Sequence, residues 1–191
     1  MGEVVVVENV TLDGVMQAPG GADEDPRGGF RHGGWAQPYM DRVAAETMGR
    51  GMGDDGAMLF GRRTYQQFHG FWSAQTDGNP YTEVLNRKHK YVASRSRDTA
   101  LPWENSSLLE GEATETVAKL KQDVTGALVV LGSGELVRAL TAAGLVDVYT
   151  LSIHPLTLGE GTKLFGDAYR KMQLVETVTT TTGVIIATYR P

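Results

Sequence analysis

The sequence contains no cysteine, and this absence excludes both disulfide bonds and thiolate metal sites. Long hydrophobic runs are also missing, because the run of four valines at residues 4–7 is far too short to span a bilayer. The first residues have neither the basic region nor the cleavage site of a secretory signal peptide. We therefore expect a cytoplasmic protein with no membrane partner.

Positive charge is scarce as well. The 191 residues include 18 Lys and Arg against 23 Asp and Glu, which gives a formal net charge of −5. Clustered Lys and Arg drive the binding of nucleic acids by neutralising phosphates, so we expect no nucleic-acid partner. His32, His69 and His89 lack metal-ligand spacing, and the chain shows neither a Ser/His/Asp arrangement nor a pair of hydrolase carboxylates. We expect no metal site.

What is present is the composition of an ordinary globular protein, with 41% hydrophobic residues, and the length favours a single domain over residues 1–191. Valine- and leucine-rich runs predict strands at residues 4–7, 57–60, 91–94, 127–131, 146–153, 173–181 and 184–189. The first run, being continuous, suits a strand buried on both faces. The last two runs flank Gly183 and predict an antiparallel hairpin.

Helices are predicted between these strands. The first has Pro38 in its first turn and is ended by glycines at positions 49, 51 and 53. Others cover residues 62–68, follow an N-cap at Thr114, and follow the sequence GSGE before Gly144. Residues 17–34, rich in glycine and acidic side chains, predict a long mobile loop of the kind that is often functional. The order indicates an α/β fold with a mostly parallel sheet and an antiparallel C-terminal hairpin.

Three short motifs each follow a predicted strand: GRRTY at residues 61–65, SRS at 94–96 and GSGEL at 132–136. Glycines let the backbone approach a pyrophosphate, and amides at a helix start donate to it. Arginine offers a planar fork to a further phosphate. GSGEL alone is equally well explained by an ordinary strand-to-helix turn, and GRRTY or SRS alone is better explained by a surface turn with a helix-capping Ser or Thr. Together they favour a dinucleotide site, and the second, arginine-bearing anion site favours NADP over NAD.

GSGEL lacks the Lys-Ser or Lys-Thr ending of a P-loop, which excludes triphosphate hydrolysis by that route. The motifs LFGRRTY, VASRS, VVLGSGELVRAL and IHPLTLGEGTKLF, together with the opening VENVTLDG, resemble the dihydrofolate reductase fold. The resemblance spans nearly the whole chain. It is closest to the branch related to the reductase domain of riboflavin biosynthesis, the RibD C-terminal domain.

This resemblance implies a three-layer dihydrofolate reductase-like protein that uses NADPH, acts like dihydrofolate reductase or 5-amino-6-(5-phosphoribosylamino)uracil reductase, and forms a homodimer. It places the segment 12–17 near the nicotinamide and residues 17–34 in the position of the loop that closes over the cofactor. The implied cofactor-binding residues are Met16, Gln17, Gly61, Arg62, Arg63, Thr64, Ser94, Arg95, Ser96, Gly132, Ser133, Gly134, Glu135 and Leu136.

The substrate side matches the family less well. Trp35 and Tyr39 are the candidates for stacking a flat heterocycle, although core packing is the commoner role of such residues. Asp41 lies six residues after Trp35, where dihydrofolate reductases have five, and one residue rotates a side chain by about 100° around a helix. Asp13 is the competing candidate acid, with a turn-forming role as its alternative. His154 is either a proton donor or a structural residue.

The sequence therefore predicts an NADPH-dependent reductase acting on a small, flat heterocyclic or carbonyl substrate. A non-catalytic protein that binds NADP or a folate-like ligand on the same fold is the alternative. A third hypothesis is a Rossmann-type nucleotide protein that uses GSGEL alone.

Overall fold

The computed structural model describes residues 1–51, 56–76, 80–166 and 169–191. Its residue contacts divide the chain into two compact units, each described separately below. The first unit holds Met1–Val5 and Gly53–Asp147, and the second holds Val6–Met52 and Val148–Pro191. The single domain expected from the sequence over residues 1–191 stays a prediction.

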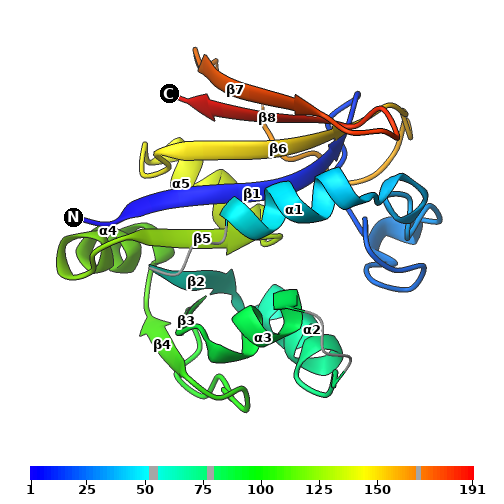
Figure 1. Ribbon diagram of the computed structural model, residues 1–191. Coiled ribbons are helices and arrows are strands. Elements are labelled where there is room, and N and C mark those ends of the chain that lie inside the picture. Colours follow the sequence, from blue (N-terminus) through cyan, green and yellow to red (C-terminus); the bar gives the residue numbers. More distant parts are fainter. Residues whose placement is uncertain (52–55, 77–79, 167–168) are drawn as a thin grey trace. The chain divides into compact units, whose positions relative to one another are not determined.

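The first unit is built on parallel strands in the order β4-β3-β2-β5 (Figure 1). These are β2 (Gly56–Gly61), β3 (Lys90–Ser94), β4 (Ser106–Glu110) and β5 (Ala127–Leu131). Its helices are α2 (Arg62–Trp72), α3 (Pro80–Arg87), α4 (Ala113–Asp123) and α5 (Gly134–Ala142). The central strands β2 and β5 are buried almost throughout, as expected for parallel strands covered on both faces.

The second unit is built on β1 (Glu3–Thr11), which begins in the first unit, and on β6 (Val148–His154), β7 (Gln173–Thr179) and β8 (Ile185–Arg190). The strand order is β1-β6-β8-β7, and β8 pairs antiparallel with both β6 and β7. Helix α1 (Arg42–Gly51) contributes Ala44 to a small core with Val184 and Ile186. The predicted mostly parallel α/β sheet and its C-terminal hairpin are thus confirmed.

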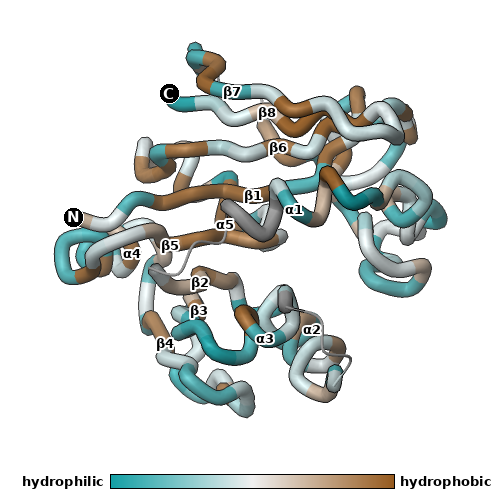
Figure 2. Tube along the Cα trace, in the orientation of Figure 1, coloured by the Kyte–Doolittle hydropathy of each residue, from teal (hydrophilic) through white to brown (hydrophobic). Residues whose placement is uncertain are grey.

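Strand β1 differs from its prediction. The run at residues 4–7 is not uniformly buried: Val4 and Val6 are fully buried, whereas Val5 and Val7 are partly exposed. The alternation shows that one face of the strand packs more tightly than the other. Figure 2 shows that hydrophobic residues are concentrated along β1 and β5.

Two helix starts were predicted wrongly. Pro38 lies in a separate 3-10 turn, Gln37–Tyr39, and α1 begins only at Arg42, because the Asp41 carboxylate caps it by accepting from the Ala44 N–H at 2.7 Å. Helix α4 begins at Ala113, so Thr114 lies inside it and Glu112 is the N-cap residue. Helix α1 continues through residue 49 to Gly51, and the third predicted stop, residue 53, lies outside the described residues.

The segment 17–34 is packed against its surroundings at several points. It contains a 3-10 turn, Arg27–Gly29, and its Phe30 joins Val15, Ala18 and Trp35 in a hydrophobic cluster. The backbone N–H of Gly34 donates to the Ala18 carbonyl at 2.8 Å, which closes the base of the segment. The predicted mobility of this loop stays a prediction.

Across the described parts of the chain, no helix is both long enough and apolar enough to cross a membrane.

Candidate functional site

The three predicted anion-binding motifs lie at one edge of the first unit. Strands β3, β2 and β5 are adjacent and parallel, with Gly61 opposite Ala93 and Leu59 opposite Val130. Their carboxyl ends therefore meet at the same edge, and each runs directly into one motif: SRS after β3, GRRTY after β2 and GSGEL after β5. Open α/β sheets bind ligands at this edge, beyond the carboxyl ends of the strands.

GSGEL and GRRTY are joined by direct hydrogen bonds. The Ser133 N–H donates to Thr64 Oγ1 at 3.1 Å, and the Gly61 N–H donates to Ser133 Oγ at 3.0 Å. Ser133 is buried and adopts a left-handed conformation, with φ 61° and ψ 41°. The Ser133 side chain is thus held between the two loops, where it fixes their geometry instead of pointing toward solvent.

The start of α5 has the features of an anion site. Gly132 has a positive φ of 60°, and a Cβ built there would lie 3.0 Å from Thr64 Cγ2, so glycine permits the close packing of the two loops. No described side chain caps the helix. The N–H groups of its first turn, in the segment Gly134–Leu136, point out of the helix end, as they do wherever a helix receives a phosphate.

The arginines near this edge differ in their partners. Arg62 is exposed and has no hydrogen-bond or ion-pair partner for its side chain in the described structure. Arg63 pairs with Glu135 at 3.3 Å, and Arg95 lies 3.8 Å from Glu112. Both pairs are largely exposed to solvent, where such contacts are weak and exchange readily. The edge can therefore present guanidinium groups to an anionic ligand.

The two serines of SRS form hydrogen bonds within their own turn. Ser94 is buried, and its Oγ accepts from the Ser96 N–H at 3.2 Å and from Thr99 Oγ1 at 2.8 Å. The Ser96 carbonyl oxygen, 2.8 Å from Thr99 Oγ1, is the alternative acceptor for the single hydrogen of this hydroxyl. Thr99, which the sequence analysis did not single out, therefore shapes the turn that carries the exposed Arg95.

In the second unit, Asp13 holds two loops together. Its carboxylate accepts from Thr11 Oγ1 at 2.5 Å, from the Gly159 N–H at 2.8 Å and from the Leu158 N–H at 3.2 Å. The Thr11 hydroxyl, the Gly159 amide and then the Leu158 amide lower the pKa of Asp13 to about 2. This carboxyl is an ionised acceptor near neutral pH, which disfavours it as a proton donor.

Asp41 is engaged in a similar way. Besides capping α1, it accepts from the Thr181 N–H and the Thr181 hydroxyl, both at 2.6 Å. The Thr181 hydroxyl and the Ala44 amide lower the pKa of Asp41 below its ordinary value. The carboxylate thus connects α1 to the β7–β8 turn. The assignment of Asp13 and Asp41 as catalytic acids stays a prediction, and these contacts argue against it.

The predicted substrate aromatics, Trp35 and Tyr39, meet at a histidine. Both rings pack edge-on against His154, with centroids at 5.1 and 5.5 Å. Trp35 is buried and donates from Nε1 to the Gln17 carbonyl at 2.7 Å. His154 Nε2 lies 3.0 Å from Asn9 Oδ1, and burial lowers the pKa of His154 to about 4. The imidazole is therefore neutral near pH 7.

Gln17 and Met16 connect the loop 17–34 to the segment that follows β6. The Gln17 amide donates to the carbonyls of Asp25 and Arg27 at 3.0 and 2.9 Å, and its Oε1 accepts from the Thr162 N–H and hydroxyl at 2.9 and 3.0 Å. The Met16 N–H donates to the Thr162 carbonyl at 2.9 Å. The polar atoms of the Gln17 side chain are therefore occupied by hydrogen bonds within the protein.

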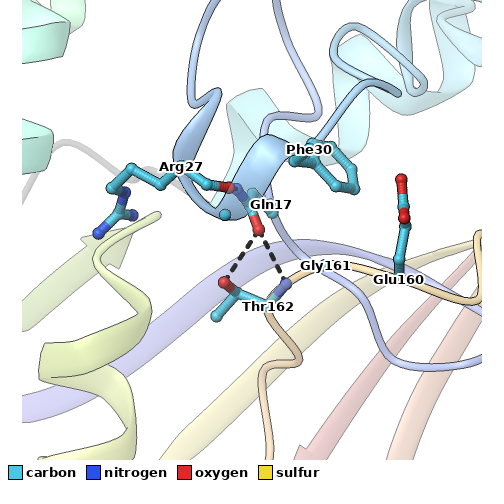
Figure 3. Close-up of a pocket in the computed structure, with 7 residues that line it drawn as sticks. Gln17, Arg27, Phe30, Glu160, Gly161 and Thr162 are labelled. Carbon is cyan, nitrogen blue, oxygen red and sulfur yellow. Dashed lines mark hydrogen bonds between the residues drawn. The ribbon is translucent and has the colours of Figure 1, made fainter.

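A pocket of about 320 Å³ opens beside this contact (Figure 3). Gly161, with a φ of 107°, passes so close to Phe30 that a Cβ there would lie 2.7 Å from the ring. Glu160 projects from the same segment and pairs with His32 at 3.2 Å. The pocket is lined by Gln17, Arg27, Gly28, Phe30, Glu160, Gly161 and Thr162.

Glu8 and Asn9, neighbours on β1, were not predicted from the sequence as functional residues. Asn9 holds the imidazole of His154, and Glu8 is a buried carboxyl, 4% exposed. A signal for Glu8 was present, since it occupies a buried position in the alternating pattern that Val4 and Val6 begin. In the described part of the chain, His, Cys, Asp and Glu form no group of three or more that could hold a metal ion.

The α/β fold, with its three loops at the carboxyl ends of β3, β2 and β5, is dihydrofolate reductase-like. Dihydrofolate reductase from Enterococcus faecalis, solved with NADP(H) and RAB-propyl, superposes with a TM-score of 0.63 at 15% identity, covering 99% of this chain and 96% of that one. A putative riboflavin biosynthesis protein from Shewanella sp. PV-4 gives a TM-score of 0.66 at 19% identity, with 98% of each chain covered.

The sequence matches the RibD C-terminal domain family over residues 3–186, and the chain belongs to this family. It is also 27% identical over 190 residues to the uncharacterized protein YyaP of Bacillus subtilis (strain 168), which covers 94% of this chain and 90% of that protein. The resemblance argued from the motifs is thereby confirmed.

Proposed function

We propose that the protein is an NADPH-dependent reductase that delivers hydride to a small, flat heterocycle of the pterin or pyrimidine kind, or to a carbonyl compound. The observation that carries the proposal is the alignment of SRS, GRRTY and GSGEL at the carboxyl edge of three adjacent parallel strands. Membership of a family named for a riboflavin-biosynthesis reductase supports the reaction class. The NADP(H) bound to the Enterococcus faecalis enzyme, which shares the fold, supports the cofactor.

The residues at the edge fit this cofactor. The first-turn amides of α5 would bind the pyrophosphate, and Gly132 keeps the backbone close to Thr64. Arg62, with no side-chain partner in the described structure, would pair with the 2′-phosphate, aided by Arg95 from the SRS turn. When bound, NADPH supplies the hydride from its nicotinamide ring, and the protein supplies orientation and exclusion of water.

On the substrate side, the proposal assigns the stacking of a flat ring to Trp35 and Tyr39. Their contacts with the neutral His154 hold both rings at defined angles. Asp13 and Asp41 hold the surrounding loops in place through their hydrogen bonds to backbone amides. The proposal includes a cytoplasmic location, as expected from the sequence, and a homodimer, on the basis of the family resemblance.

The decisive experiment compares NADPH with NADH, because only NADPH carries the 2′-phosphate. We expect Arg62→Ala and Arg95→Ala each to weaken NADPH binding about tenfold or more, which corresponds to the loss of one charged hydrogen bond, and to leave NADH binding unchanged. Arg42→Ala is the matched control, since Arg42 is an exposed arginine of the second unit that pairs with Glu46. If wild-type protein neither changes NADPH fluorescence nor gains thermal stability from millimolar NADPH, the proposal fails.

A second candidate is a protein that binds NADP or a folate-like ligand without reducing it. The engagement of Asp13 and Asp41, with lowered pKa values, favours this alternative, because neither carboxyl is poised to give up a proton. Tight NADPH binding with no oxidation across a panel of pterins, pyrimidines and quinones would support it. Turnover of any one of these compounds would exclude it.

A further inference from the structure

The imidazole of His154 has one nitrogen that no other group of the protein contacts through a hydrogen bond. His154 is 2% exposed, and its Nδ1 has almost no contact with solvent and no hydrogen-bond partner in the described structure. A buried polar atom without a partner destabilises the folded protein, so such atoms are rare and call for a specific explanation. Contact with a ligand is one such explanation.

The other nitrogen of the ring determines where the hydrogen lies. His154 Nε2 is 3.0 Å from Asn9 Oδ1, an amide oxygen that can only accept. Burial lowers the pKa of His154 to about 4, so the ring carries a single hydrogen near pH 7. That hydrogen lies on Nε2, which donates to Asn9, and Nδ1 therefore presents a lone pair. This lone pair can accept from an N–H or O–H group, and it has nothing to offer to an acceptor.

His154 lies beside the less buried face of β1. Val7 and Asn9 are partly exposed, whereas Val6 and Val10 are buried. Successive side chains of a strand point to opposite faces, so Val7 lies on the same face as Asn9, which contacts His154. A ligand that lies on this partly exposed face reaches the imidazole without entering the buried face of the strand.

The two aromatic rings that pack against His154 are held differently. Trp35 is buried, and its Nε1 donates to the Gln17 carbonyl at 2.7 Å, which fixes the indole. Tyr39 is partly exposed, and its carbonyl accepts from the Thr182 hydroxyl at 2.6 Å, which holds the backbone. Among the described residues, the Tyr39 hydroxyl has no hydrogen-bond partner. The Tyr39 ring can therefore turn away from the imidazole while its backbone stays in place.

We propose that His154 Nδ1 is the hydrogen-bond acceptor that selects the substrate of this reductase. It accepts from an N–H or O–H group on the edge of the flat ring, with Trp35 as the fixed wall of the site and Tyr39 as the movable one. Asn9 positions the imidazole. The inference rests on the proposed function and divides the compounds considered there. A heterocycle with a donor on its edge gives Nδ1 its missing partner, whereas a quinone or a simple carbonyl compound leaves the nitrogen unpaired.

The first experiment needs no variant. The full wild-type chain, labelled with ¹⁵N in its histidines and saturated with NADP⁺, is titrated with pterin, 5-aminouracil or menadione. Pterin and 5-aminouracil carry N–H donors, and menadione carries neither an N–H nor an O–H group. Correlations between ring and backbone assign the His154 nitrogens. We expect Nδ1 to resonate as an unprotonated nitrogen, and to shift toward the value of a hydrogen-bonded one with pterin or 5-aminouracil but not with menadione.

Two substitutions separate the two nitrogens of the ring. The amide of His154→Gln reaches the position of Nε2 and keeps the contact with Asn9, but it places no acceptor at Nδ1. This variant should bind the donor-bearing ring about tenfold more weakly, with the affinity for NADPH and for menadione within about twofold of wild type. His154→Asn places an amide oxygen as far from the backbone as Nδ1 and should regain part of the affinity. His32→Gln, at a half-exposed histidine of the same unit, is the matched control and should bind as wild type does.

Four results overturn the inference: a hydrogen on Nδ1 in the wild-type protein, an Nδ1 resonance that stays in place with both donor-bearing compounds, binding of neither compound, or a loss in His154→Gln below threefold. An equal loss of affinity for menadione also overturns it, because a histidine with a purely structural role would affect all three compounds alike. Wild-type protein that fails to bind NADPH rejects the proposed function and the inference with it. The other results reject the inference alone.

Discussion

The backbone N–H of Ser133 donates a hydrogen bond to the Thr64 hydroxyl at 3.1 Å, which joins the loop after β5 to the first turn of α2. Thr64→Val keeps the shape of the side chain but leaves this N–H without an acceptor, at a cost of about 1–3 kcal/mol in the free energy of unfolding. We also expect weaker NADPH binding, because the two loops lose their fixed relation. Urea denaturation and NADPH titration measure the two effects.

Thr64→Ser separates the hydrogen bond from the packing of the Thr64 methyl group, because it retains the accepting oxygen. It should recover most of the stability and of the NADPH affinity lost in Thr64→Val. A loss in the serine variant with wild-type stability and affinity in the valine variant would show that the methyl contact with the 132–133 turn, and not the hydrogen bond, connects the loops.

Glu135 lies in the first turn of α5 and pairs with Arg63 at 3.3 Å. Its negative charge stabilises the free helix start but repels a phosphate bound there. Glu135→Gln should therefore strengthen NADPH binding, by about two- to fivefold at low salt, and lower stability by about 0.3–1 kcal/mol. Isothermal titration at two salt concentrations checks this, since the gain should shrink when ions screen the charge.

Glu115→Gln provides the comparison for Glu135→Gln. Glu115 occupies the first turn of α4, whose start is not one of the three motifs. This variant should show a small loss of stability with no change in NADPH affinity. Unchanged affinity in Glu135→Gln would mean that the cofactor phosphates do not bind at the start of α5.

The positions of these loops could be predicted from the sequence, because a valine- or leucine-rich strand followed by glycine or by Arg and Ser is a local pattern. The contacts that fix them could not be predicted in this way. Ser133 and Thr64 are 69 residues apart, Asp13 and Gly159 are 146 apart, and Asp41 and Thr181 are 140 apart. No local pattern indicates which distant amide a carboxylate will bind, and both acids therefore stayed open as proton donors.

The elements missed by the sequence analysis are short. Helix α3 has eight residues, and β4 has five partly or fully exposed residues, so neither shows a clear apolar periodicity. The opposite case is Glu8, where a pattern existed and was not used. An acidic residue at a buried position of an otherwise apolar alternation is visible in the sequence, and its meaning depends on the absence of partners, which only the structure shows.

Asp13→Asn should destabilise the protein in a defined range of pH. The pKa of Asp13 is lowered from 3.8 to about 2 in the folded protein. The ionised carboxylate therefore contributes to the free energy of unfolding above pH 3.8, and this contribution is lost as the pH falls toward 2. We expect the variant to be clearly less stable than wild type at pH 7 and the difference to shrink between pH 3.8 and 2. Urea denaturation at pH 7, 4 and 2 measures it.

Asp23→Asn, at an exposed aspartate of the same unit, is the control for Asp13→Asn and should match wild type throughout. A stability difference for Asp13→Asn that stays constant from pH 7 to 2 would show that the lost hydrogen bonds to Leu158 and Gly159 matter only through their geometry and not through the charge of Asp13.

His154 should impose a second, separate dependence on pH. Burial lowers the pKa of His154 from 6.5 to about 4, so the folded protein holds this imidazole neutral while the unfolded chain takes up a proton. Its contribution to stability is present above 6.5 and is lost as the pH falls toward 4. For each unit by which the pH falls within that range, the unfolding equilibrium constant should rise by up to about tenfold.

His154→Gln keeps a polar partner for Asn9 but cannot titrate, and its stability should change much less over this range than that of wild type. His32→Gln, at a half-exposed histidine, is the control and should retain the wild-type dependence. Because the range from 6.5 to 4 lies above the range assigned to Asp13, urea denaturation at closely spaced pH values resolves the two groups. An equally steep pH dependence in His154→Gln would show that another group is responsible for the loss of stability in mild acid.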